Sequence, residues 1–141
     1  MIRTIEVLAY VLRGEHLLVV ERSDGPIRGL QVPYGPIGEG EDIREAVVRE
    51  VTEETGLSAS INGYLGVAEY DMSNYGRAEV RERHVFQLEP PVNSPADPWD
   101  HPAGTDEGTV RRLSWLHLDD PGLQLEAGHG ALLGRVRRPV A

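Results

Sequence analysis

The 141-residue sequence contains no cysteine and no lysine, since all fourteen of its basic residues are arginine. Without cysteine the protein has no thiol nucleophile, no disulfide bond and no thiolate zinc site. Without lysine it forms no Schiff base through a side chain and lacks the phosphate-binding lysine of a P-loop. The chemistry that remains is that of carboxylates, hydroxyl groups, histidines and metal ions.

The sequence also lacks the segments that direct a chain into or across a membrane. It has no run of about eighteen apolar residues, and its opening, MIRTIEVLAY, has neither the basic start nor the long apolar stretch of an export signal. We therefore expect a cytoplasmic protein with no membrane partner.

Composition predicts one globular domain over residues 1–141, because 40% of the residues are hydrophobic and 26% are charged. The formal net charge of -9 repels polyphosphate backbones, so we expect no nucleic-acid duplex as a partner. A small anionic substrate would need a cation between itself and this acidic protein.

Hydrophobic patterning predicts several strands and two helices. Branched and apolar residues predict a hairpin from residues 2–12 and 17–20, a short strand at 30–33, and strands at 64–70, 83–89 and 110–116. Glycines and prolines predict loops at 34–40 and 90–108. Helices are expected after Asp42 and over residues 130–138. The fold class is therefore α/β or α+β, with helices packed on a sheet.

The central helix has clear start and stop signals. Asp42 can cap its N-terminus, Glu45 can complete a capping box three residues later, and Gly56 can end it. Residues spaced three or four apart share a helix face, so this helix should present Glu50, Glu53 and Glu54 together, beside its apolar stripe.

These three acids are unfavourable as plain surface residues. Like charges four residues apart destabilise a helix by about 0.2–0.5 kcal/mol per pair, and more where apolar groups desolvate them. Glu53 and Glu54 also lie near the helix C-terminus, where negative charge opposes the helix dipole. A divalent cation would compensate, and Mg²⁺ prefers carboxylate oxygens while leaving positions for phosphate oxygens. The helix is therefore a candidate magnesium site.

The segment around this helix resembles the Nudix box at every defining position. That box is a glycine, a glutamate, an Arg-Glu-aliphatic-any-Glu-Glu run and a Gly-aliphatic pair at fixed spacing. The matching residues are Gly35, Glu41, Arg49, Glu50, Val51, Glu53, Glu54, Gly56 and Leu57. The resemblance implies the Nudix fold, in which a mixed sheet is sandwiched between helices, and the box forms a loop-helix-loop unit.

The resemblance also implies a function and site residues. Nudix hydrolases typically cleave a nucleoside diphosphate linked to another moiety, using Mg²⁺ or Mn²⁺. By this resemblance Glu53 and Glu54 would bind the metal, and Glu50 would be a further ligand or the general base. A carbonyl near Tyr34 or Gly35 could add another ligand. Arg49 and Glu41 would pair to hold loop and helix in register.

Many members of the family recruit a further acid from a distal loop. Glu107 is the candidate ligand here, with Asp106 as the near alternative. Homodimers are common among similar proteins, so the resemblance also admits a homodimer. Substrate signatures outside the box are weak: Tyr75 lies one position from a tyrosine favoured by members that cleave diadenosine polyphosphates.

Other classes of function fit parts of the sequence. A Nudix-fold module that senses a nucleotide without cleaving it would have the same fold, but such modules generally have eroded boxes. An interaction domain with an acidic helix would not need the glycine spacing. Nudix-fold isomerases use a catalytic cysteine, which is absent here.

Three further features could contact a substrate, although packing or solvent exposure is the favoured interpretation of each. They are Trp99 with His101 in the proline-containing loop, His84 on a strand, and the alternating arginines Arg77, Arg81 and Arg83.

Overall fold

The computed structural model describes residues 1–22, 25–102 and 110–139. Within them lie seven strands and one α-helix. The strands are β1 (Ile2–Arg13), β2 (His16–Arg22), β3 (Tyr34–Pro36), β4 (Ser60–Asp71), β5 (Glu79–Glu89), β6 (Trp99–Pro102) and β7 (Val110–His117). The helix is α1 (Ile43–Thr55), and η1 (Met72–Tyr75) and η2 (Leu133–Arg135) are short 3₁₀ turns.

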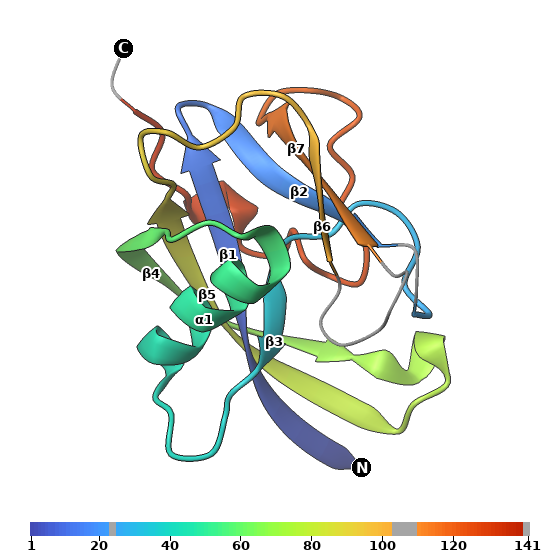
Figure 1. Cartoon of the computed structure of the whole chain (residues 1–141). Coiled ribbons are helices and arrows are strands. Elements are labelled where there is room, and N and C mark those ends of the chain that lie inside the picture. The colour runs from blue at the N-terminus through green and yellow to red at the C-terminus, as the bar shows by residue number, and fades with distance from the viewer. Residues whose placement is uncertain (23–24, 103–109, 140–141) are drawn as a thin grey trace.

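The strands form one mixed sheet in the order β4-β5-β1-β2-β7-β6, with β3 paired to β1. Only the β1–β5 pair is parallel among the pairs of named strands; the others are antiparallel. The expected mixed α+β architecture is therefore confirmed. Figure 1 shows β1 running through the middle of the sheet, with α1 against one face of it.

The core has two layers because residues of β1 alternate between the two faces of the sheet. Val7, Ala9 and Val11 are buried in the layer that contains Val47 and Val51 of α1. Leu8, Tyr10 and Leu12 are buried in the opposite layer, against which Leu132, Leu133 and Val136 pack. A strand buried on both faces reads as a continuous apolar run, as the sequence of β1 does.

Helix α1 begins and ends where its sequence predicts. The Asp42 carboxylate accepts a hydrogen bond from the backbone N–H of Glu45 at 2.9 Å. Gly56 ends the helix in the left-handed conformation, at a φ of 80°, and its N–H donates to the carbonyl of Thr52. Two local signals thus fix the ends of the helix that carries the acids.

The second predicted helix, over residues 130–138, is wrong. The segment contains only the η2 turn, and its apolar residues pack on the sheet without helical structure. Glycine destabilises a helix by about 1 kcal/mol, and this short segment contains Gly130 and Gly134. Its backbone groups form hydrogen bonds with partners outside the segment instead: the N–H of Leu132 donates to the Tyr10 hydroxyl. Among the described residues, only one face of the sheet therefore carries an α-helix.

Two predicted loops also contain strands. Residues 34–40 begin with β3, which pairs with β1, and residues 90–108 contain β6, which pairs with β7. Conversely, the strand predicted at 30–33 is reduced to isolated bridges at Leu30 and Gln31. Short edge strands depend on a partner distant in sequence, so local composition does not predict them.

None of the helices in the described ranges has the length and apolar character needed to span a membrane.

Candidate active site

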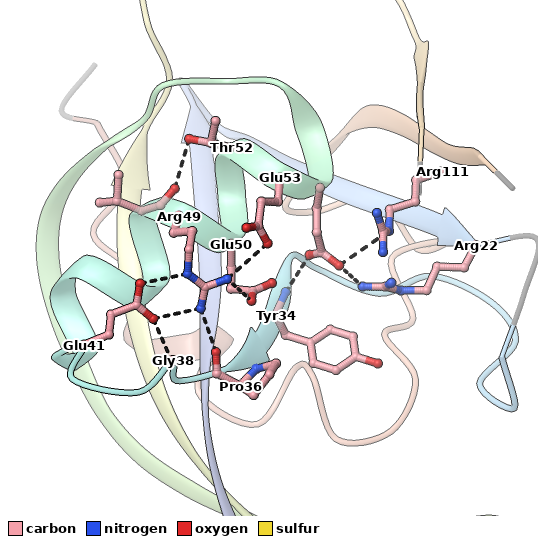
Figure 2. Close-up of polar contacts among 12 residues, drawn as sticks. Arg22, Tyr34, Pro36, Gly38, Glu41, Arg49, Glu50, Thr52, Glu53 and Arg111 are labelled. Carbon is pink, nitrogen blue, oxygen red and sulfur yellow. Dashed lines mark hydrogen bonds and ion pairs between the residues drawn. The ribbon is translucent and has the colours of Figure 1, made fainter. Parts of the chain in front are cut away.

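Arg49 joins the loop before α1 to the acids on the helix (Figure 2). Its Nε and Nη2 donate to the two carboxylate oxygens of Glu41, each at 2.8 Å, and Nη2 also donates to the carbonyl of Pro36 at 2.9 Å. Its Nη1 donates to Glu50 at 2.7 Å and to Glu53 at 3.0 Å. A planar guanidinium with five fixed donors suits this arrangement, which a lysine could not reproduce.

Glu41 is held in turn by the glycine-rich loop. The backbone N–H of Gly38 donates to Glu41 Oε1 at 2.8 Å. Hydrogen bonds from Arg49, and then from Gly38, lower the pKa of Glu41 to about 2. Glu41 also raises the pKa of Arg49, so both partners remain charged. The ion pair expected between Arg49 and Glu41 is present and fixes the loop against the helix.

Glu50 lies in a space that only glycine leaves open. Its carboxylate faces Gly35, where an added Cβ would lie 2.2 Å from the carboxyl carbon. The residue is only 7% exposed, and burial raises the pKa of its carboxyl against the opposing effect of Arg49. The first glycine of the box therefore makes room for a buried carboxylate.

Glu54 is the most deeply buried of the three helix acids. Arg22 donates to its Oε1, the N–H of Tyr34 donates to its Oε2 at 2.8 Å, and Arg111 lies 3.6 Å from Oε1. Its side chain is 4% exposed, and desolvation raises the pKa of the carboxyl to about 7 in spite of the two arginines. Glu53, by contrast, has a side chain that is 58% exposed.

Arg22 and Arg111 are direct partners in the antiparallel pairing of β2 with β7. Like charges placed opposite each other on neighbouring strands are destabilising. Here the carboxylate of Glu54 compensates for both, and Figure 2 shows the two guanidinium groups pointing toward the same place beside α1. The sheet thus holds two cations at the end of the acidic helix face.

The three helix carboxylates have the donor chemistry of a magnesium site. Within the described residues, no group of three acidic or histidine side chains is arranged to hold a metal ion. Each of these acids instead contacts a guanidinium group: Arg49 contacts Glu50 and Glu53, and Arg22 contacts Glu54. All three therefore already interact with a cation, and their oxygens are the hard ligands that Mg²⁺ prefers.

Comparison with known proteins shows to which family the chain belongs. The model of the NUDIX domain matches residues 2–134. The chain belongs to the Nudix family. Its fold is also that of a NUDIX hydrolase from Nitrosomonas europaea, with a TM-score of 0.65 and 25% identity over 97% of this chain and 82% of that one. A MutT NUDIX hydrolase from Burkholderia pseudomallei has the same fold, with a TM-score of 0.67 and 22% identity over 97% of this chain and the whole of that one.

Relatives in sequence have different named activities. A putative 8-oxo-dGTP diphosphatase of Bacillus subtilis (strain 168) is 37% identical over 74 residues, which cover 52% of this chain and 44% of that protein. An ADP-ribose pyrophosphatase of Methanocaldococcus jannaschii is 39% identical over 56 residues, which cover 39% of this chain and 33% of that protein. The matches span less than half the length of these relatives, so they do not by themselves assign a substrate.

The Nudix fold brings together residues that the box alone does not contain. Arg22 and Arg111 come from separate strands, and no local pattern distinguishes them from other strand arginines. The backbone N–H of Tyr34 also contacts Glu54, and a metal-binding role for a carbonyl near Tyr34 or Gly35 stays a prediction. Glu107 and Asp106, the candidate distal acids, lie outside the described residues.

For residues outside the box, the structure confirms one prediction and contradicts another. Trp99 donates from its indole to the carbonyl of Thr55 at 3.0 Å and packs on the core, which confirms its packing role. The solvent-exposed interpretation is wrong for Arg83, which is 1% exposed and donates to Glu6 at 2.8 Å. The parallel pairing of β1 with β5 places this buried pair side by side.

Proposed function

We propose that the protein hydrolyses a diphosphate linkage in a small molecule that contains a nucleoside diphosphate. Water attacks one phosphorus, the other phosphate leaves, and the reaction requires Mg²⁺ or Mn²⁺. The observation that carries the proposal is the arrangement of Glu50 and Glu54. Both are buried carboxylates with raised pKa values, placed beside arginines at a Nudix box with no defining residue missing.

Burial of Glu50 and Glu54 lowers the stability of the folded protein, and a functional role of these acids would explain why they are buried. A carboxylate removed from water loses solvation free energy that hydrogen bonds only partly return. Helix α1 contains Glu50, Glu53 and Glu54 within five residues, and the Gly35 backbone approaches closely enough to enclose one of them. An interaction domain would need none of this enclosure, so a metal-dependent site explains the arrangement better.

The roles proposed for the chain's own residues follow from their positions. Glu53 and Glu54 hold the cation with Glu50, or Glu50 accepts the proton of the attacking water as general base. When bound, the cation neutralises phosphate oxygens and makes a bound water more acidic. Arg49 keeps Glu50 and Glu53 oriented, and the Arg49–Glu41 pair maintains the loop. Glu107, with Asp106 as the alternative, is proposed as an additional acid.

The direct test is a substrate panel. The purified protein is incubated with Mg²⁺ and with ADP-ribose, nucleotide sugars, dinucleoside polyphosphates or nucleoside triphosphates, and product release is measured. We expect Glu53→Gln and Glu54→Gln to lower turnover by orders of magnitude while the protein stays folded. The matched control is Glu45→Gln, an exposed acid of the same helix, which should leave turnover unchanged.

Two outcomes would contradict the proposal. Unchanged turnover in both active-site variants would remove these acids from the reaction. Binding of a nucleotide without any product release would identify a sensor instead of a hydrolase. That the protein is cytoplasmic and that it forms a homodimer both remain predictions.

A further inference from the structure

A small cavity lies next to the acidic site and is lined by three arginines. Its volume is about 110 Å³, and its lining includes Arg22, Arg77, Arg81, Gln31 and Tyr34. No acidic side chain is among the lining residues that the structure describes; Ser23 and Asp24, which follow Arg22, lie outside that description. All three arginines also pair with acids outside the lining: Arg22 with Glu54, and Arg77 and Arg81 with Glu79.

Arg22 connects this cavity to the proposed metal site. On one side its Nη2 donates to Glu54, and on the other it lines the cavity, with its Cζ 4.8 Å from the centre of the Tyr34 ring. The backbone N–H of Tyr34 also donates to Glu54. Two lining residues therefore contact the same carboxylate, so the cavity and the acidic site share a wall.

Polar groups of the lining have donor and acceptor capacity left over. The Nε of Arg22 and the Oε1 of Gln31 are buried without a hydrogen-bond partner among the described residues. Arg81 has a side chain that is 13% exposed, yet its ion pairs are long, at 3.4 Å to Glu79 and 3.7 Å to Glu6. Buried polar groups are normally satisfied, so the Arg22 Nε and the weakly paired Arg81 leave donor capacity for a ligand that supplies acceptors, whereas Gln31 Oε1 is an acceptor and would need a donor.

The size of the cavity limits what that ligand can be. Drug-sized molecules occupy pockets of about 300–1,000 Å³, whereas one water accounts for about 30 Å³. A cavity of about 110 Å³ is too small for a nucleoside and holds a group of a few heavy atoms. A phosphoryl group has this size, and arginine binds its oxygens in a planar, bidentate geometry.

We propose that this cavity binds a phosphoryl group of the substrate that is separate from the diphosphate under attack. The attacked diphosphate must lie against Glu50, Glu53 and Glu54, and none of these lines the cavity. The inference rests on the proposed function and narrows it: the preferred substrates contain three or more phosphoryl groups, as nucleoside triphosphates and dinucleoside polyphosphates do.

The test compares inorganic tripolyphosphate with pyrophosphate, using calorimetric binding in the presence of Mg²⁺. Arg77→Gln changes a cavity arginine whose side chain is 54% exposed, so the variant should fold. Its matched control is Arg112→Gln, an arginine that is 59% exposed and outside the cavity. Loss of one charged hydrogen bond should weaken tripolyphosphate binding about tenfold in Arg77→Gln, with little change for pyrophosphate. Neither ligand should be affected in Arg112→Gln.

Kinetics then separate this inference from the proposed function. In wild type, kcat/KM for a dinucleoside polyphosphate should exceed that for ADP-ribose, and Arg77→Gln should reduce this ratio mainly through KM. Equal weakening of both inorganic ligands, or of neither, would overturn the cavity assignment even if hydrolysis occurs. If wild type hydrolyses no diphosphate, the proposed function fails, but selective loss of tripolyphosphate binding in Arg77→Gln would still support the cavity.

Discussion

Gly35 and Glu50 are packed so closely that a methyl group at position 35 would lie 2.2 Å from the Glu50 carboxyl carbon. A Gly35→Ala substitution must therefore displace the Glu50 carboxylate, which is the far end of a side chain and can move without unfolding the protein. We expect turnover to fall at least tenfold while the fold is retained, because small displacements of reacting groups are costly to catalysis.

The control for this prediction is Gly134→Ala, where an added Cβ has no heavy atom within 4 Å. Steady-state kinetics and circular dichroism of the two variants check the outcome. Full activity in Gly35→Ala would show that the position of Glu50 does not matter to the reaction.

Arg49 should tolerate no replacement, not even by lysine. Arg49→Lys keeps the charge but loses the planar fork that contacts Glu41, Glu50 and the carbonyl of Pro36 together. We expect the free energy of unfolding to fall by about 1–2 kcal/mol and turnover to fall with it. Denaturant unfolding measures the first change. Arg44→Lys, an exposed position on the same helix, should be neutral, and equal effects of both substitutions would contradict this role.

The sequence predicts α1 and its site well because their signals are local. The cap at Asp42, the stop at Gly56 and the spacing of the acids all lie within one continuous segment. The sequence does not predict that Arg22 and Arg111 meet at Glu54, because that depends on the register between β2 and β7. A shift of one residue in the register of either strand would turn its arginine to the other face of the sheet, away from Glu54.

The difference between local signals and contacts distant in sequence also explains the other wrong predictions. Residues 130–138 have apolar spacing suited to a helix, but tertiary contacts with Tyr10 and the sheet determine their path. Arg83 looks like a solvated strand residue until the parallel partner strand places Glu6 next to it. Alternation along one strand shows which residues share a face, but it does not show which face is covered.

Removal of Arg111 should strengthen metal binding. Its guanidinium lies 3.6 Å from Glu54 Oε1, where it attracts the carboxylate and repels a second cation. Charges at such distances interact by several kcal/mol before solvent screening, so we expect Arg111→Gln to bind Mn²⁺ at least about threefold more tightly in the absence of substrate. The measurement is made at a pH high enough to keep Glu54 ionised, because loss of Arg111 also raises the pKa of this carboxyl. Titration followed by electron paramagnetic resonance measures this affinity. Arg112→Gln removes the neighbouring charge, which is paired with Asp100, and is expected to change Mn²⁺ affinity less.

His129 should make the stability of the protein depend on pH. The residue is fully buried, its Nδ1 accepts a hydrogen bond from the N–H of Val32 at 3.1 Å, and its ring packs against Tyr34. Burial, followed by Arg83, Arg22 and Arg81, lowers the pKa of His129 well below 6.5. The folded protein therefore keeps this ring neutral at a pH where the unfolded chain protonates it.

Because the unfolded state binds the additional proton, the His129 contribution to the free energy of unfolding falls as pH decreases below about 6.5, by at most about 1.4 kcal/mol per unit. In His129→Gln this contribution is absent, so the stability difference between wild type and variant should shrink from pH 7.5 to pH 5. Denaturant unfolding at several pH values measures it. The raised pKa of Glu54 acts in the opposite direction, but it is common to both proteins and cancels in the difference. A difference that stays constant across this range would show that His129 is protonated equally in the folded and unfolded states.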